Sequence, residues 1–111
     1  MNVTFKNKNL DEICNDFKLS QKMYGKVGAK RLQQRLQELR IVNNLAEMRN
    51  FPGRCHELKG NLAMVLSLDL NHPFRLLFKS ANDPIPCKED GGLDWTAVTA
   101  VEIIGVEDTH G

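Results

Sequence analysis

The spacing of apolar residues changes near Cys55, and this change limits the folds open to the chain. Before it, apolar residues recur every three to five positions, as a helix requires, at Met23, Val27, Leu32, Leu36 and Leu39. After it, apolar and polar residues alternate, as in a half-buried strand, at Leu62, Met64, Leu66, Leu68 and Leu70, and again at Phe74, Leu76 and Phe78. Helices followed by strands favour an α+β fold.

Turn and capping residues divide the two halves into elements. In chain order, we expect a strand over 2–6, a helix over 10–17, a longer helix after Ser20 that is most regular over 29–40, a short helix after Asn44, a hairpin over 62–78, a loop over 80–96 and a final strand over 98–106. Asn9, Ser20 and Asn44 are the candidate N-caps. We predict one domain over 1–111, with two to three helices on one face of a mainly antiparallel sheet of four to five strands. The other face is then free for a ligand.

Bulk properties exclude several classes of protein. A chain of 111 residues forms a single domain with a small core. It has no apolar run long enough to cross a bilayer and no apolar secretory leader, so we expect a cytoplasmic protein without membrane contact. Cys14, Cys55 and Cys87 form no CxxC pair, and we expect reduced thiols rather than a disulfide framework or a zinc site.

Charge is unevenly distributed along the chain. The formal net charge is only +1, yet residues 18–49 hold eight lysines and arginines against two glutamates, and the last 25 residues are acidic. The field of the protein is therefore one-sided in a way that the net charge conceals.

Candidate catalytic residues lie on the expected strands and at their ends. His56 and Lys59 precede the hairpin, Arg75 interrupts an apolar strand, and Asp108 and His110 form a terminal Asp-x-His. Cations combined with an imidazole suit cleavage of a phosphodiester without a metal or cofactor. An arginine can bind a phosphate through bidentate hydrogen bonds, and an imidazole can protonate a leaving oxygen.

Each of these residues also has a purely structural interpretation. Lys59 can be a solvated surface lysine, and His110 can be a frayed terminal residue. Arg75 can form a surface ion pair, with Asp69 or Glu102 as the candidate partner. His72, in the turn before Pro73, is interpreted as structural.

Five short motifs follow one another along the chain: Phe5-Lys6-Asn7-Lys8-Asn9-Leu10, Lys30-Arg31-Leu32-Gln33-Gln34-Arg35-Leu36, His56-Glu57-Leu58-Lys59-Gly60, Phe74-Arg75-Leu76 and the terminal Asp108-Thr109-His110. In this order they resemble the HigB-type toxins of the RelE/ParE superfamily. The resemblance covers nearly the whole chain, apart from the loop at 80–96, and it implies a RelE-like fold.

The resemblance implies a toxin of a type II toxin–antitoxin module that cleaves messenger RNA on the ribosome without a metal and so inhibits growth. Lys59 and Arg75 would stabilise charge or aid deprotonation, and Asp108 and His110 would serve the leaving group. His56 would orient neighbours or donate to a phosphate. Thr109 stands at the substrate-binding position where the family has Tyr, and a threonine cannot stack on a base.

The implied partner is a HigA-type helix-turn-helix antitoxin, and operator DNA is reached only through that antitoxin. Two other interpretations remain open. One is a ParE-type growth inhibitor that is not a nuclease. The other is a degenerate toxin that keeps only its antitoxin-binding surface.

Overall fold

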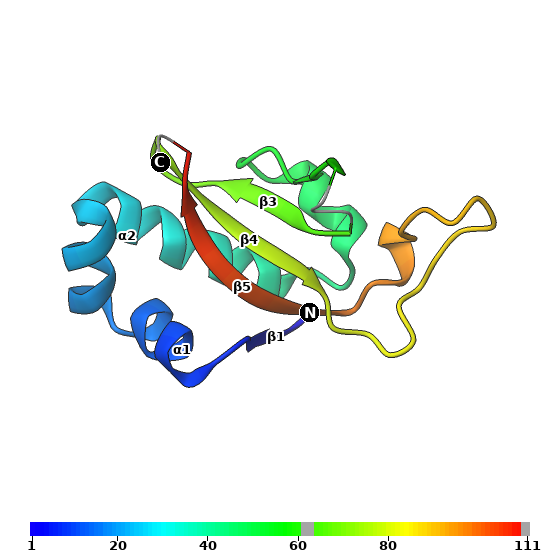
Figure 1. Cartoon of the computed structure of the whole chain (residues 1–111), viewed down its shortest axis with the longest axis horizontal. Helices are drawn as coiled ribbons and strands as arrows, with labels where there is room; N and C mark the ends of the chain where they lie inside the picture. The colour runs from blue at the N-terminus through cyan, green and yellow to red at the C-terminus, as the bar shows by residue number, and fades with distance from the viewer. Residues whose placement is uncertain (61–63, 110–111) are drawn as a thin grey trace.

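A five-stranded sheet with helices on one face forms the protein (Figure 1). The computed structural model describes residues 1–60 and 64–109. The sheet order is β1-β5-β4-β3-β2, with bounds β1 Asn2–Phe5, β2 His56–Glu57, β3 Leu66–Asp69, β4 Phe74–Ser80 and β5 Ala100–Asp108. Strands β1 and β5 are parallel, and the other pairs are antiparallel. The predicted α+β class is confirmed.

The helices begin at caps that differ in part from the predicted ones. Helix α1 spans Lys8–Asn15, and its cap is Asn7 rather than Asn9. Helix α2 spans Phe17–Ile41, and its cap is Asp16, whose carboxylate accepts from two backbone N–H groups, rather than Ser20. The Ser20 side chain is buried and donates to a carbonyl of α1 instead. The 3-10 helix η1, Leu45–Asn50, is capped by Asn44 as predicted.

Gly25 interrupts α2 with a backbone conformation, φ 78° and ψ 170°, that L side chains rarely adopt. Beyond it, the expected core positions Leu32, Leu36 and Leu39 are fully buried. Met23 and Val27 were expected on the same buried stripe and are instead about half exposed, at 52% and 50%. The kink shifts the helical phase, so the apolar stripe does not continue across it.

The hairpin sets the two faces of the sheet. Leu68 pairs with Leu76 in register, both are fully buried, and both point toward the helices. Asp69 pairs with Arg75 one residue further on, so these two side chains point to the opposite face. The strand expected from position 62 begins only at Leu66. Met64 lies in a turn with φ 69°, and position 62 is outside the described residues.

The remaining segments complete the sheet and its edge. The final strand ends at Asp108, two residues beyond the predicted end. The expected loop holds one isolated bridge, between Cys87 and Leu93, and leads into the 3-10 helix η3, Trp95–Ala97. Among the described residues, no helix is both long and apolar enough to cross a membrane.

A buried ion pair ties α2 to the end of the hairpin. Arg35 and Glu38 lie 3.3 Å apart with side chains only 3% and 10% exposed. The Arg35 Nε also donates to the Asp69 carbonyl at 2.9 Å. A buried guanidinium with two partners holds the helix and β3 in a fixed relation.

Replacing Arg35 by alanine should lower the free energy of unfolding by about 3–5 kcal/mol, because Glu38 is left as an unpaired buried charge. Urea denaturation measures this. Arg31→Ala, an exposed position on the same helix, is the control and should change stability little. The prediction fails if both variants lose the same amount.

Candidate functional site

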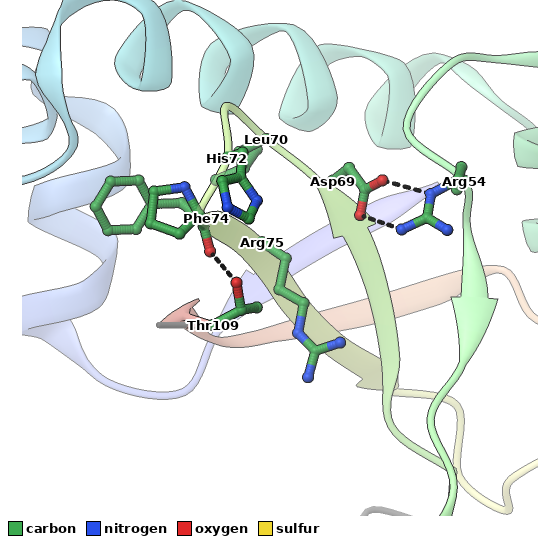
Figure 2. A pocket seen from close by; sticks show the side chains of 8 residues that line it. Arg54, Asp69, Leu70, His72, Phe74, Arg75 and Thr109 are labelled. Carbon is green, nitrogen blue, oxygen red and sulfur yellow. Dashed lines mark hydrogen bonds and ion pairs between the residues drawn. The ribbon is translucent and has the colours of Figure 1, made fainter. Parts of the chain in front are cut away.

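A cavity of about 300 Å³ opens at the end of the β3–β4 hairpin (Figure 2). Its walls hold two guanidinium groups, a carboxylate, an imidazole and an aromatic ring, and they comprise Arg54, Asp69, Leu70, His72, Pro73, Phe74, Arg75 and Thr109. This volume is at the lower end of the range for small-ligand sites. Two arginines, a threonine hydroxyl and a phenylalanine ring together suit part of a nucleotide better than they suit an apolar ligand.

Strand register places a row of charges across the open face of the sheet. Arg75 on β4 lies opposite Asp69 on β3 and opposite Glu107 on β5. Its Nε donates to the Glu107 carboxylate at 2.5 Å, and its side chain is 26% exposed. Arg75 therefore does form an ion pair, but the partner is Glu107 rather than Asp69 or Glu102.

Arg54 is a cavity residue that the sequence analysis missed. Its Nε donates to Asp69 Oδ2 at 2.6 Å and its Nη2 to Asp69 Oδ1 at 3.4 Å. The hydrogen bond that Arg54 donates to Asp69 raises the pKa of Arg54, and the negative charge of Asp69 raises it further. Only the strand register of the structure links this residue to the site: His56 pairs with Ser67, so position 54 falls opposite position 69.

His56 and Lys59 follow the cavity residue Arg54 closely in the sequence, but neither residue lines the cavity. His56 is exposed on β2, with its Nδ1 2.7 Å from the Arg54 carbonyl. A carbonyl only accepts, so Nδ1 carries the proton in this hydrogen bond. In the neutral ring, Nε2 then has the free lone pair. Lys59 is exposed in the segment after β2.

The two described residues of the C-terminal triplet, Asp108 and Thr109, lie toward different faces of the sheet. Thr109 lines the cavity, and both its backbone N–H and its Oγ1 donate to the Pro73 carbonyl at 2.9 Å. Asp108 pairs with Phe74, one position from the Arg75–Glu107 pair, so its side chain points away from the face that carries Arg75. His110, the predicted general acid, lies outside the described residues.

The hairpin turn contributes more to the site than the sequence suggested. His72 was interpreted as structural, and the structure also places it in the cavity wall. Phe74, at the start of β4, packs edge-on against Tyr24 of α2 with ring centroids 5.3 Å apart. Burial, and then the neighbouring Cys14, raise the pKa of Tyr24, so its hydroxyl stays protonated. The contact between the Phe74 and Tyr24 rings packs one wall of the cavity against α2.

Two of the three cysteines are poor candidates for a nucleophile. All three thiols are free. Burial raises the pKa of Cys14 to about 11 and that of Cys55 to about 12. At neutral pH the reactive thiolate form of either residue is therefore scarce. The third thiol, Cys87, is exposed but does not line the cavity.

The fold is that of the RelE/YoeB-like toxins. Two solved structures from Staphylococcus aureus show this likeness. The YoeB–YefM complex matches with a TM-score of 0.56 and 20% identity, over 96% of this chain and 94% of that chain. The YoeB dimer matches with a TM-score of 0.52 and 19% identity, over 95% and 92%. No protein-family model and no curated protein sequence matches the chain. Both structures are of YoeB, so the HigB subtype stays a prediction.

The contact at His56 leads to a spectroscopic prediction. In the neutral imidazole of His56, the proton should reside on Nδ1, because that atom faces a carbonyl that can only accept. Long-range ¹H–¹⁵N correlation spectra report the tautomer, and the His56→Gln variant assigns the signals. Finding the proton on Nε2 would show that the ring does not donate to Arg54.

Proposed function

We propose that this chain is the toxin of a type II toxin–antitoxin module and cleaves messenger RNA on the ribosome without a metal. The observation that carries the proposal is the placement of Arg75. It lies partly buried in a cavity on the open face of a RelE/YoeB-like fold, and Glu107 holds its Nε. The guanidinium has five N–H groups, so four are left for a phosphate.

The proposed reaction uses the RNA 2′-hydroxyl as nucleophile. A bond forms between O2′ and phosphorus while the bond from phosphorus to O5′ breaks, which yields a 2′,3′-cyclic phosphate and a 5′-hydroxyl. One proton leaves the 2′-oxygen for a base, and another is delivered to O5′. Arg75 stabilises the extra negative charge that the phosphate gains in the transition state.

The remaining predicted residues supply the proton transfers. His56, whose Nδ1 faces the Arg54 carbonyl, is proposed to orient its neighbours or, when its ring is protonated, to donate from Nε2 to a phosphate. Lys59, exposed in the segment after β2, is proposed to stabilise charge or to aid deprotonation of the 2′-hydroxyl. Asp108 and His110 were both expected on the leaving-group side; because the Asp108 side chain points away from the face that carries Arg75, we assign that role to His110. Thr109 contacts the substrate at the cavity.

The partner in this proposal is an antitoxin, of the HigA type on the strength of the sequence motifs. One solved structure with this fold is a YoeB–YefM complex. The first part of α2 leaves apolar side chains exposed at Phe17, Leu19, Met23 and Val27, with lysines at 18, 22, 26 and 30 between and beside them. An acidic amphipathic segment of an antitoxin suits such a surface.

Substituting Arg75 or His110 by alanine should each lower cleavage by about 10²-fold or more, because each is assigned to the transition state. Primer extension on cellular RNA after induction detects the cuts, and growth reports toxicity. Lys79→Ala is the control, since Lys79 is also an ion-paired cation on β4.

The same measurement separates the alternatives. Growth arrest without RNA cleavage would favour a ParE-type inhibitor. A wild-type protein that neither cleaves nor arrests growth, yet binds an antitoxin, would be a degenerate toxin. Unchanged cleavage in both the Arg75 and His110 variants would refute the assigned mechanism.

The partner surface has a separate test. Met23→Glu should weaken antitoxin binding by about 10-fold or more, since it places a charge in an apolar contact, and should leave cleavage unchanged. Isothermal titration with the antitoxin measures the affinity. Ile85→Glu is the matched control because Ile85 is equally exposed, at 47%, but lies on the distant loop. Equal losses in both variants would argue against this surface.

A further inference from the structure

We infer that Arg54 is a second phosphate-binding residue, which holds an RNA phosphate next to the one that Arg75 contacts. The inference rests on the proposed function and adds a substrate-binding residue to its site. It follows from the position of Arg54 in the cavity wall, from its free hydrogen-bonding capacity and from the contacts that fix its backbone.

The backbone at Arg54 is fixed from two sides. The Asp69 backbone N–H donates to the Gly53 carbonyl at 2.7 Å. Arg35 packs beneath the same turn so closely that a Cβ added to Gly53 would lie 2.7 Å from the Arg35 Nε. Gly53 also has φ +109°, so a side chain there would be strained as well as crowded. A buried residue of α2 therefore sets the position from which the Arg54 side chain projects.

Asp69 orients the Arg54 side chain but occupies only some of its hydrogen-bond donors. Asp69 takes the Nε proton and one Nη2 proton, so three of the five N–H groups are left. The side chain is 77% exposed, which leaves these groups accessible to a ligand. The carboxylate thus acts as a support that directs a charged donor at the cavity, as Glu107 does for Arg75.

Two guanidinium groups in one cavity, carried by segments two strands apart, suit a chain of phosphates better than one isolated anion. Arg54 continues the line of β2 and Arg75 lies on β4, with Asp69 of β3 between them. Two strand spacings separate their backbones, which is roughly 10 Å. A nucleotide with the phosphate on each side of it can bridge such a span. Figure 2 shows Asp69 hydrogen-bonded to Arg54 at one edge of the cavity, with Arg75 between Asp69 and Thr109.

The test measures binding of a 2′-O-methyl RNA oligonucleotide, which lacks the attacking hydroxyl and is not cut. Fluorescence anisotropy over a range of salt concentrations gives both the affinity and its salt dependence. Arg54→Ala should weaken binding about 5- to 10-fold and reduce the slope of log K against log salt by about 0.7, the value for one lost phosphate contact on a single strand. Lys88→Ala, which removes another exposed, carboxylate-paired cation outside this cavity, should leave the slope unchanged.

Two further variants distinguish phosphate binding from a structural ion pair. Arg54→Lys should keep the full slope with an intermediate affinity, because the charge remains and the planar fork is lost. Arg54→Ala combined with Asp69→Arg should recover the slope, because a guanidinium returns to the same cavity edge. A residue that only braced the fold would instead lower the urea midpoint, and the double substitution would not restore binding.

The inference is overturned if the Arg54→Ala variant shows the same slope of log K against log salt as the wild type. It is also overturned if the wild-type protein does not bind the oligonucleotide. The proposed function fails separately. If the wild type binds the oligonucleotide through Arg54 but cuts no messenger RNA on ribosomes, the nuclease assignment is wrong and the phosphate site stands. If it cuts and the Arg54 substitution changes nothing, only the assignment of Arg54 is wrong.

Discussion

The buried guanidinium of Arg35 is the contact on which the site depends. Taking a charge out of water is costly, and that cost is offset here by the Glu38 carboxylate and the Asp69 carbonyl. The same side chain fills the space beneath Gly53, at the turn that leads into β2. One helix residue thereby fixes both the end of β3 and the backbone of Arg54. The cavity is consequently built on the rigid part of the fold, which is what precise placement of a phosphate requires.

Each cavity arginine is paired with a carboxylate, which reconciles a net charge of +1 with a proposed RNA site. The pairs Arg54–Asp69 and Arg75–Glu107 cancel in formal charge, so the cavity does not attract anions over a long range as a basic patch would. What the pairs supply instead is orientation, with two guanidinium forks held before a ligand arrives. Long-range attraction toward RNA is better provided by the exposed lysines and arginines of residues 18–49.

The predictable features of the fold were those with a local signal. The change of periodicity gave the fold class, Asn44 marked a helix start, and Arg75 stood out as a charge within an apolar strand. Arg54 was not predicted because its position beside Asp69 depends on the pairing of β2 with β3. Strand β2 has only two residues, too few to give a recognisable pattern in the sequence. Met23 and Val27 were misplaced because Gly25 alone does not reveal that it bends the helix rather than merely weakening it.

Thr109 shows how one position can change its task within a similar framework. The motifs resembled a family with Tyr at this place, where an aromatic ring can stack on a base. Here the Thr109 hydroxyl donates to the Pro73 carbonyl, as its backbone N–H does, and the residue fastens the end of β5 to the hairpin turn. The aromatic surface of the cavity comes from Phe74 on β4 instead, which Tyr24 supports from α2. By strand alternation, the Phe74 ring points to the side opposite Arg75, toward Tyr24 of α2, so it closes one end of the cavity and does not lie beside the two arginines.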